Sequence, residues 1–186
     1  MSKKHDGKLA SYDYALTALT PWSGLFRDKV VYCNDDDIDG GIPQFFLRHF
    51  DRLKLSALYV SNGDDGGIYY KYAGDDPTDP PYKRLEKKSS YDDEVPLEYL
   101  AEADIVISQP LHSHVSKYMA FMADSGKPYL CLTMAGSKKL ERIKKLLNAG
   151  AMRIWGDKHK ATFDIGGGDT VREPVLWLTN IFPKPE

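Results

Sequence analysis

Residues 30–37, Val-Val-Tyr-Cys-Asn-Asp-Asp-Asp, form a short apolar run that opens directly into an acidic loop. Residues 104–112, Asp-Ile-Val-Ile-Ser-Gln-Pro-Leu-His, have the same design with a different polar loop. Short β-branched runs of this kind predict buried strands. In an open parallel sheet, ligands lie beyond the carboxyl ends of the strands, so we expect the two loops to meet at one pocket.

Short β-branched runs alternate along the chain with longer amphipathic stretches, which is the pattern of an α/β fold with a parallel sheet. Strands are predicted at residues 29–33, 57–61, 105–108, 129–132, 152–155 and 175–179, and helices at 42–53, 113–123 and 137–147. The interval 62–94 is rich in Gly, Pro and Asp and is expected to be a long irregular loop region. Residues 1–186 are expected to form a single domain.

The charge balance is slightly acidic, with 27 Asp and Glu against 25 Lys and Arg and a formal net charge of −2. Affinity for duplex DNA depends on Lys and Arg that neutralise phosphates, so DNA binding is expected to be weak or dependent on a partner. The lysine-rich stretch 138–145 is interpreted as a solvated helix face. The sequence has no apolar run of about 18 residues and no signal-peptide pattern. We therefore expect a cytoplasmic protein that does not associate with membranes.

Two patterns resemble metal sites, but neither is complete. Residues 35–39 carry alternating Asp, as in the first half of a calcium loop, yet the twelfth position is Phe46 where that loop needs Glu. His112 and His114 form a pair at i and i+2 without a second close pair of ligands. No metal site is predicted.

Three motifs in the same order resemble the EcoRI-type DNA adenine-N6 methyltransferase family. Residues 30–34 match its opening Val-Val-Tyr-Cys-Asn strand, and residues 104–110 are similar to its Asp-Ile-Val-Val-Thr-Asn-Pro strand and acceptor loop. Residues 176–180, Leu-Trp-Leu-Thr-Asn, match its late strand. The resemblance implies a Rossmann-like methyltransferase fold, a mostly parallel sheet with helices on both faces. It also implies a diverged, truncated member without the C-terminal target-reading region.

The acceptor loop departs from the family pattern at the positions that bear the chemistry. The resemblance assigns catalysis to Ser108, Gln109, Pro110 and His112. In the family, an Asn side chain and a Pro carbonyl accept hydrogen bonds from the adenine amine, and an aromatic ring stacks on the flipped base. Gln109 is one methylene longer than Asn, and a misplacement of about 1 Å can cost about a hundredfold in rate. Weak or lost catalysis is therefore expected.

The resemblance also implies S-adenosylmethionine as the cofactor, with loss of cofactor binding as the alternative. Its binding residues are expected to include Cys33, Asn34 and Asp35 after the first strand. Asp64 follows the second strand, where α/β proteins place a carboxylate on ribose hydroxyls, and a plain Gly-Asp turn is the alternative. Tyr14 is expected to contact the adenine, with ordinary core packing as the alternative.

The sequence is compatible with two functions. The first is a pseudoenzyme, a methyltransferase-like protein that binds S-adenosylmethionine, a protein partner from DNA restriction-modification, or itself. The second is an active N6-adenine methyltransferase that needs a partner subunit or an unusual acceptor. An anti-restriction or host-directed inhibitor is a weaker alternative.

Overall fold

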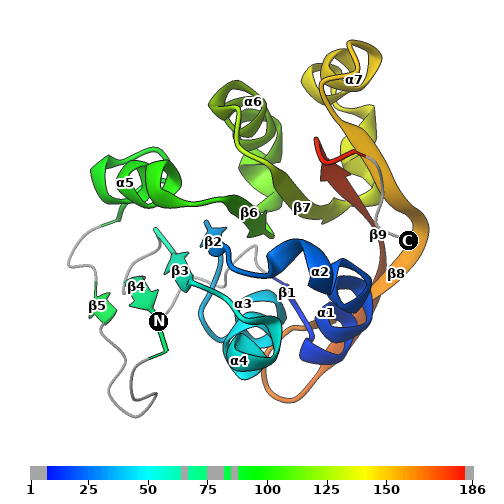
Figure 1. Ribbon diagram of the computed structural model, residues 1–186. Helices are drawn as coiled ribbons and strands as arrows, with labels where there is room; N and C mark the ends of the chain where they lie inside the picture. Colours follow the sequence, from blue (N-terminus) through cyan, green and yellow to red (C-terminus); the bar gives the residue numbers. More distant parts are fainter. Residues whose placement is uncertain (1–7, 64–66, 75–81, 85–87, 183–186) are drawn as a thin grey trace.

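The computed structural model describes residues 8–63, 67–74, 82–84 and 88–182. Their strands form one sheet in the order β1-β8-β9-β7-β6-β2-β3-β4-β5 (Figure 1). The strands are β1 (Leu9–Ala10), β2 (Val30–Asn34), β3 (Ala57–Ser61), β4 (Ile68–Tyr72), β5 (Tyr82–Arg84), β6 (Ile105–Ser108), β7 (Tyr129–Met134), β8 (Arg153–Asp164) and β9 (Thr170–Thr179).

The centre of the sheet is parallel and its flanks are antiparallel. Strands β7, β6, β2 and β3 run in one direction, with Val31 opposite both Ile105 and Leu58. Strands β9, β8 and β1 continue one side in antiparallel pairs, and β4 and β5 continue the other. The parallel sheet expected from the sequence is thus the central part of a mixed sheet.

Helices cover both faces of the sheet, as the resemblance implies (Figure 1). One face carries α1 (Tyr12–Leu19), η1 (Thr20–Trp22), α2 (Ser23–Phe26), α3 (Gly41–Arg48) and α4 (Phe50–Leu53). The other carries α5 (Glu94–Glu102), η2 (His112–His114), α6 (Val115–Ser125), η3 (Ala135–Lys139) and α7 (Glu141–Asn148). A separate cluster of buried apolar side chains fills the space under each layer. This three-layer arrangement is a Rossmann-like α/β fold.

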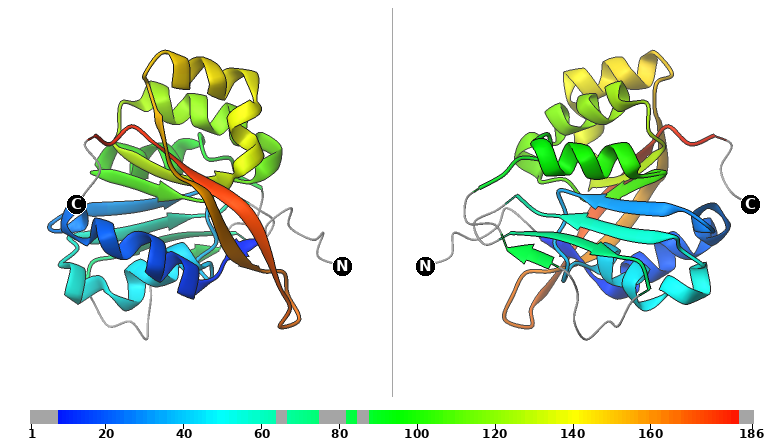
Figure 2. Two further views of the ribbon diagram at one scale, coloured as in Figure 1. Left: turned by 90° about the vertical axis from the view of Figure 1, so that its right-hand side faces the viewer. Right: turned by 60° about the vertical axis from the view of Figure 1, so that its left-hand side comes forward.

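Three segments differ from the sequence-based expectation. The predicted helix 42–53 is interrupted at His49, so α3 and α4 are separate. The interval 62–94, expected to be irregular, contains β4 and β5 in antiparallel pairing. Strands β8 and β9 extend the short predicted runs into a long hairpin that projects past the helices (Figure 2). Within the described residues, no helix is long and apolar enough to cross a membrane.

Candidate functional site

A cavity of about 500 Å³ lies beyond the carboxyl ends of the central strands. Its wall combines residues 35–37 after β2, Asn62 after β3, residues 109–113 after β6, and Met134 and Gly136 at the end of β7. Leu132, Thr133, Val115, Lys8, Leu9, Phe163 and Glu173 complete the wall. The polar loops after β2 and β6 therefore meet at one cavity, as expected from the sequence, because the ends of parallel strands share one edge of the sheet.

Asp35 is held in place by His114 of η2, which is not itself among the residues that line the cavity. Its Oδ2 lies 2.7 Å from Nε2 of His114, and the ring of Tyr91 lies against that imidazole at 5.7 Å. The backbone of Asp35 has a positive φ of 58°, a region that Asp adopts more readily than most residues. His114 thus positions Asp35, a role that its place in a histidine pair at i and i+2 does not indicate.

Asp36 is a buried carboxyl group with one unused oxygen. Only 4% of the residue is exposed. Its Oδ1 accepts a hydrogen bond from the N–H of Asp37 at 2.9 Å, whereas Oδ2 makes none within the described part of the chain. Burial therefore raises the pKa of Asp36 well above its ordinary value of 3.8.

Asp36→Asn is expected to stabilise the protein at pH 8 and to leave its stability almost unchanged near pH 4. With a raised pKa in the folded state, the Asp36 carboxyl lowers stability as pH rises from 3.8 through the folded pKa. Asparagine keeps the Oδ1 acceptor and never ionises, so the gain is about 1.4 kcal/mol for each unit of pKa shift removed. Thermal unfolding at both pH values measures this, with the exposed Asp39→Asn as the control. A variant less stable than the native chain at pH 8 would contradict the assignment.

Gln109 is part of the cavity wall, and both the oxygen and the nitrogen of its side-chain amide are hydrogen-bonded. Its Oε1 accepts a hydrogen bond from the N–H of Ala10 at 2.9 Å. Its Nε2 donates to the carbonyl oxygen of Lys8, and the Lys8 ammonium forms an ion pair with Glu173. The side chain predicted to receive a substrate amine therefore holds the N-terminal strand.

The other residues of the predicted acceptor loop divide into two groups. Pro110 and His112 line the cavity beside Gln109. Ser108 is fully buried, and its Oγ lies 2.9 Å from the hydroxyl of Tyr118 and 3.4 Å from Sγ of Cys131. Ser108 therefore belongs to the packing beneath the cavity and not to its lining.

Of the predicted cofactor-binding residues that the structure describes, only Asp35 lines the cavity. Cys33 and Asn34 are fully buried, and burial raises the pKa of the Cys33 thiol. Asn34 Oδ1 accepts a hydrogen bond from the hydroxyl of Ser61 at 3.4 Å. Asp64 lies outside the described residues.

Tyr14 is partly buried and packs against the core cluster under α1–α4, and it does not line the cavity. Its hydroxyl oxygen accepts a hydrogen bond from Nε1 of Trp177 at 3.1 Å. Burial raises the pKa of Tyr14 to about 12. The packing alternative for Tyr14 thus describes its position.

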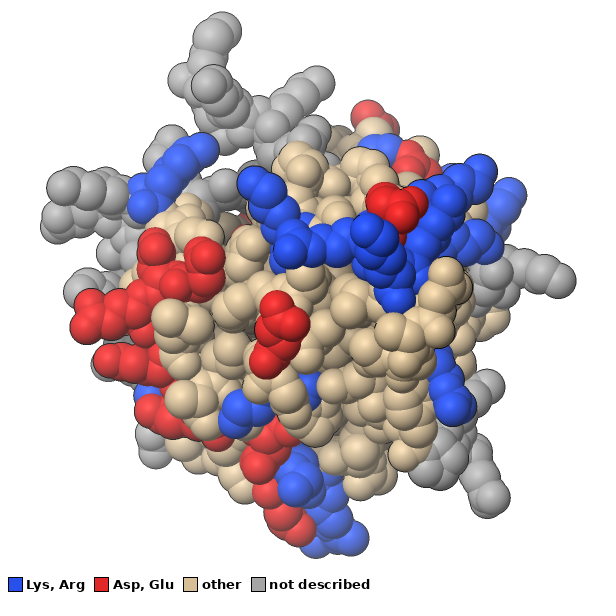
Figure 3. All heavy atoms as spheres, turned by 90° about the horizontal axis from the view of Figure 1, so that it is seen from above, with Lys and Arg blue, Asp and Glu red and all other residues tan. Residues whose placement is uncertain are grey.

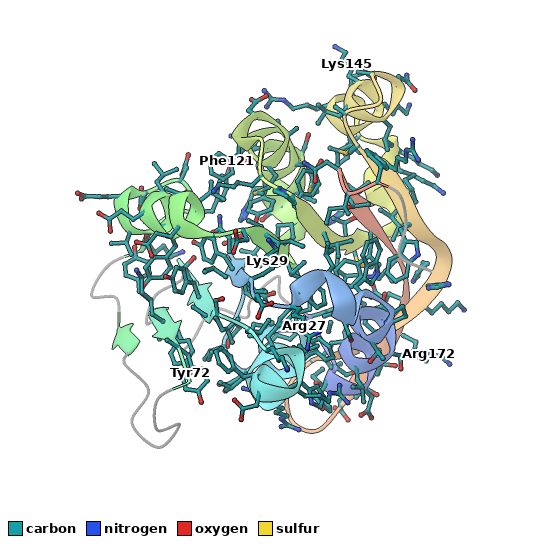
Figure 4. The ribbon with its side chains drawn as sticks, viewed as in Figure 1. Arg27, Lys29, Tyr72, Phe121, Lys145 and Arg172 are labelled. Carbon is teal, nitrogen blue, oxygen red and sulfur yellow. The ribbon has the colours of Figure 1, made fainter. Side chains whose placement is uncertain are left out.

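Charged side chains of one sign gather in two parts of the molecule. The cavity wall contains Asp35, Asp36, Asp37 and Glu173, and its one lysine, Lys8, is paired with Glu173. The exposed or half-exposed cations Lys138, Lys139, Arg142, Lys144, Lys145 and Arg153 gather on and beside α7, away from the acidic face of α5 (Figure 3). The side chain of Lys145 points outward from α7 (Figure 4). Within the described residues, no group of three or more His, Cys, Asp or Glu side chains is placed to hold a metal ion.

Comparison with known proteins finds no matching family model. The type II methyltransferase M.EcoRI of Escherichia coli is 26% identical over an alignment of 203 positions, gaps included, which covers 84% of this chain and 59% of that protein. The type II methyltransferase M.MpnI of Mycoplasma pneumoniae is 29% identical over 128 residues, which cover 67% of this chain and 39% of that protein. The chain therefore spans less than two thirds of the length of either relative. Together with the Rossmann-like fold, these similarities support a diverged relationship of the chain to the DNA methyltransferase family.

Proposed function

We propose that this methyltransferase-like protein binds S-adenosylmethionine in the cavity and that methyl transfer is suppressed while Gln109 holds residues 8–10. The observation that carries the proposal is the double engagement of the Gln109 amide by Ala10 and Lys8. The relationship to DNA methyltransferases supports the choice of cofactor.

The chemistry of the cavity fits this cofactor. Its volume of about 500 Å³ is in the range that accommodates small-molecule ligands. S-adenosylmethionine carries a positive sulfonium and an ammonium group, which the carboxylates of Asp35 and Asp37 would attract, while Asn62 offers a side chain to the ribose hydroxyls. The unpaired Oδ2 of Asp36 is a further polar group in this wall.

When bound, the cofactor supplies a methyl group whose bond to sulfur breaks as its carbon bonds to an acceptor amine, which then loses a proton. The protein contributes alignment of the acceptor amine, since this transfer needs little acid or base assistance. Gln109 cannot provide that alignment in the observed state, because two bonds to backbone groups fix the orientation of its amide. His112, exposed at the rim, remains free to stack on an acceptor ring.

Nucleic acid is proposed to reach this site only with the help of a partner. The carboxylates of the cavity wall repel phosphates, and the one lysine of that wall, Lys8, is paired with Glu173. A partner that supplies cations near the cavity would remove this obstacle. Weak DNA binding by the chain alone follows from the same charge distribution.

Asp35→Asn is expected to weaken S-adenosylmethionine binding about tenfold or more. The substitution removes a negative charge from the cavity wall, and loss of a charged hydrogen bond is worth about 1.5–3 kcal/mol. Asparagine retains an acceptor for His114, so the loop should keep its conformation. Calorimetric titration measures the affinity, and Asp39→Asn removes the same charge from an exposed position of the same loop. Equal affinities of the two variants would show that Asp35 is not a cofactor residue.

A further inference from the structure

We propose that residues 8–10 form a reversible latch over Gln109. Lifting this N-terminal latch opens the side of the cavity that is lined by residues 109–112, where an acceptor amine would bind. The inference rests on the proposed function, because it turns the suppression of methyl transfer into a regulated state. The latch residues Lys8 and Leu9 are themselves part of the cavity wall. Their departure would enlarge the cavity beside Gln109.

Within the described residues, few polar contacts attach Lys8 and Leu9, whereas Ala10 is buried in the core. The amide of Gln109 bonds to the backbone on both sides of Leu9, and Lys8 pairs with Glu173. Strand β1 adds the pairing of its two residues with Asp164 and Phe163 of β8. The side chain of Lys8 is 42% exposed, so water can replace its ionic contact when the latch lifts.

The chain that follows the latch is fixed much more firmly. Ser11 donates its backbone N–H to the carbonyl oxygen of Thr162 at 2.9 Å, and its side chain caps α1 by accepting from the N–H of Tyr14 at 3.3 Å. The carbonyl oxygens of Ala10 and Ser11 pack so closely on Gly41 that a Cβ there would lie 2.4 Å from each. Ala10 is therefore the pivot, and the latch can lift without disturbing α1.

Lifting the latch changes what Gln109 offers to the cavity. In the closed state its carbonyl oxygen and its N–H group serve the backbone of the latch. In the open state Oε1 of Gln109 is free to accept a hydrogen bond from a ligand in the cavity, which Pro110 and His112 also line. The open state thus restores an amide acceptor beside the two other acceptor-loop residues.

Lys8→Glu tests the latch, because it places a second negative charge against Glu173 while leaving Gln109 intact. The control is Lys160→Glu, which makes the same charge change at an exposed position of β8. Hydrogen exchange of the Ala10 amide, followed by NMR in the full chain, is expected to be at least tenfold faster in Lys8→Glu and unchanged in Lys160→Glu. Methylation of an adenine-containing single-stranded oligonucleotide is expected to rise only in Lys8→Glu.

Equal exchange of the Ala10 amide in the two variants would overturn the latch, and so would faster exchange without any rise in methylation. Titration with S-adenosylmethionine separates this failure from that of the proposed function. If the native chain, Lys8→Glu and Lys160→Glu all bind S-adenosylmethionine, but the two variants have equal exchange and equal methylation, the latch alone is wrong. If none of them binds the cofactor, the proposed function is wrong and the latch with it.

Discussion

Trp177→Ala is expected to lower the free energy of unfolding by about 3–5 kcal/mol, the range for removal of a large buried aromatic side chain. Trp177 is fully buried on β9, and its ring lies 6.2 Å from that of Trp155. Its Nε1 also donates the hydrogen bond to Tyr14, so the substitution leaves both a void and an unpaired hydroxyl. Urea unfolding followed by circular dichroism measures the loss.

Tyr14→Phe is the matched control for this prediction. It removes only the hydrogen bond with Trp177, which is worth about 1 kcal/mol. Because Tyr14 does not line the cavity, its replacement should leave the affinity for S-adenosylmethionine unchanged. Loss of cofactor binding in Tyr14→Phe would instead support the role in adenine binding that the family resemblance implies. A Trp177→Ala loss no larger than that of Tyr14→Phe would contradict the core position of the indole.

Gly41→Ala is expected to destabilise the protein by about 1–3 kcal/mol, as overpacking of a tight contact does. The new Cβ would lie 2.4 Å from the carbonyl oxygens of Ala10 and Ser11. These are backbone atoms, so rotation of a side chain cannot relieve the clash. The segment that carries the latch would have to shift, and Lys8 and Leu9 would move with it.

Gly24→Ala is the control for Gly41→Ala. A Cβ on Gly24 meets nothing within 4 Å, and alanine favours a helix more than glycine does. This variant is expected to be as stable as the native chain or slightly more stable. Equal unfolding midpoints for the two variants would contradict the close approach at Gly41.

Local sequence predicted the central strands and the meeting of the two loops. Residues 57–61 and 105–108 are short apolar runs that each end in Ser, and both strands have those bounds in the structure. The acidic loop after β2 and the Gln-Pro loop after β6 meet because neighbouring parallel strands end at the same edge. Strand β4 was missed, since the Gly and Asp residues around it outweighed its Ile-Tyr-Tyr-Lys-Tyr run.

The contacts that decide the state of the site could not be predicted from local sequence. Gln109 bonds to Ala10, which is 99 positions away, and His114 pairs with Asp35 across 79 positions. No periodicity or motif connects such partners. Tyr14 shows the same limit, because an amphipathic helix start is compatible with either a ligand contact or core packing until the position of Trp177 is known.

Calorimetric titration of the native chain with S-adenosylmethionine, repeated with S-adenosylhomocysteine, tests the central claim most directly. We expect saturable binding of S-adenosylmethionine and weaker binding of S-adenosylhomocysteine, because the latter lacks the sulfonium charge that the acidic cavity wall attracts. Absence of binding at millimolar concentrations of both ligands would contradict the claim that this cavity is a cofactor site.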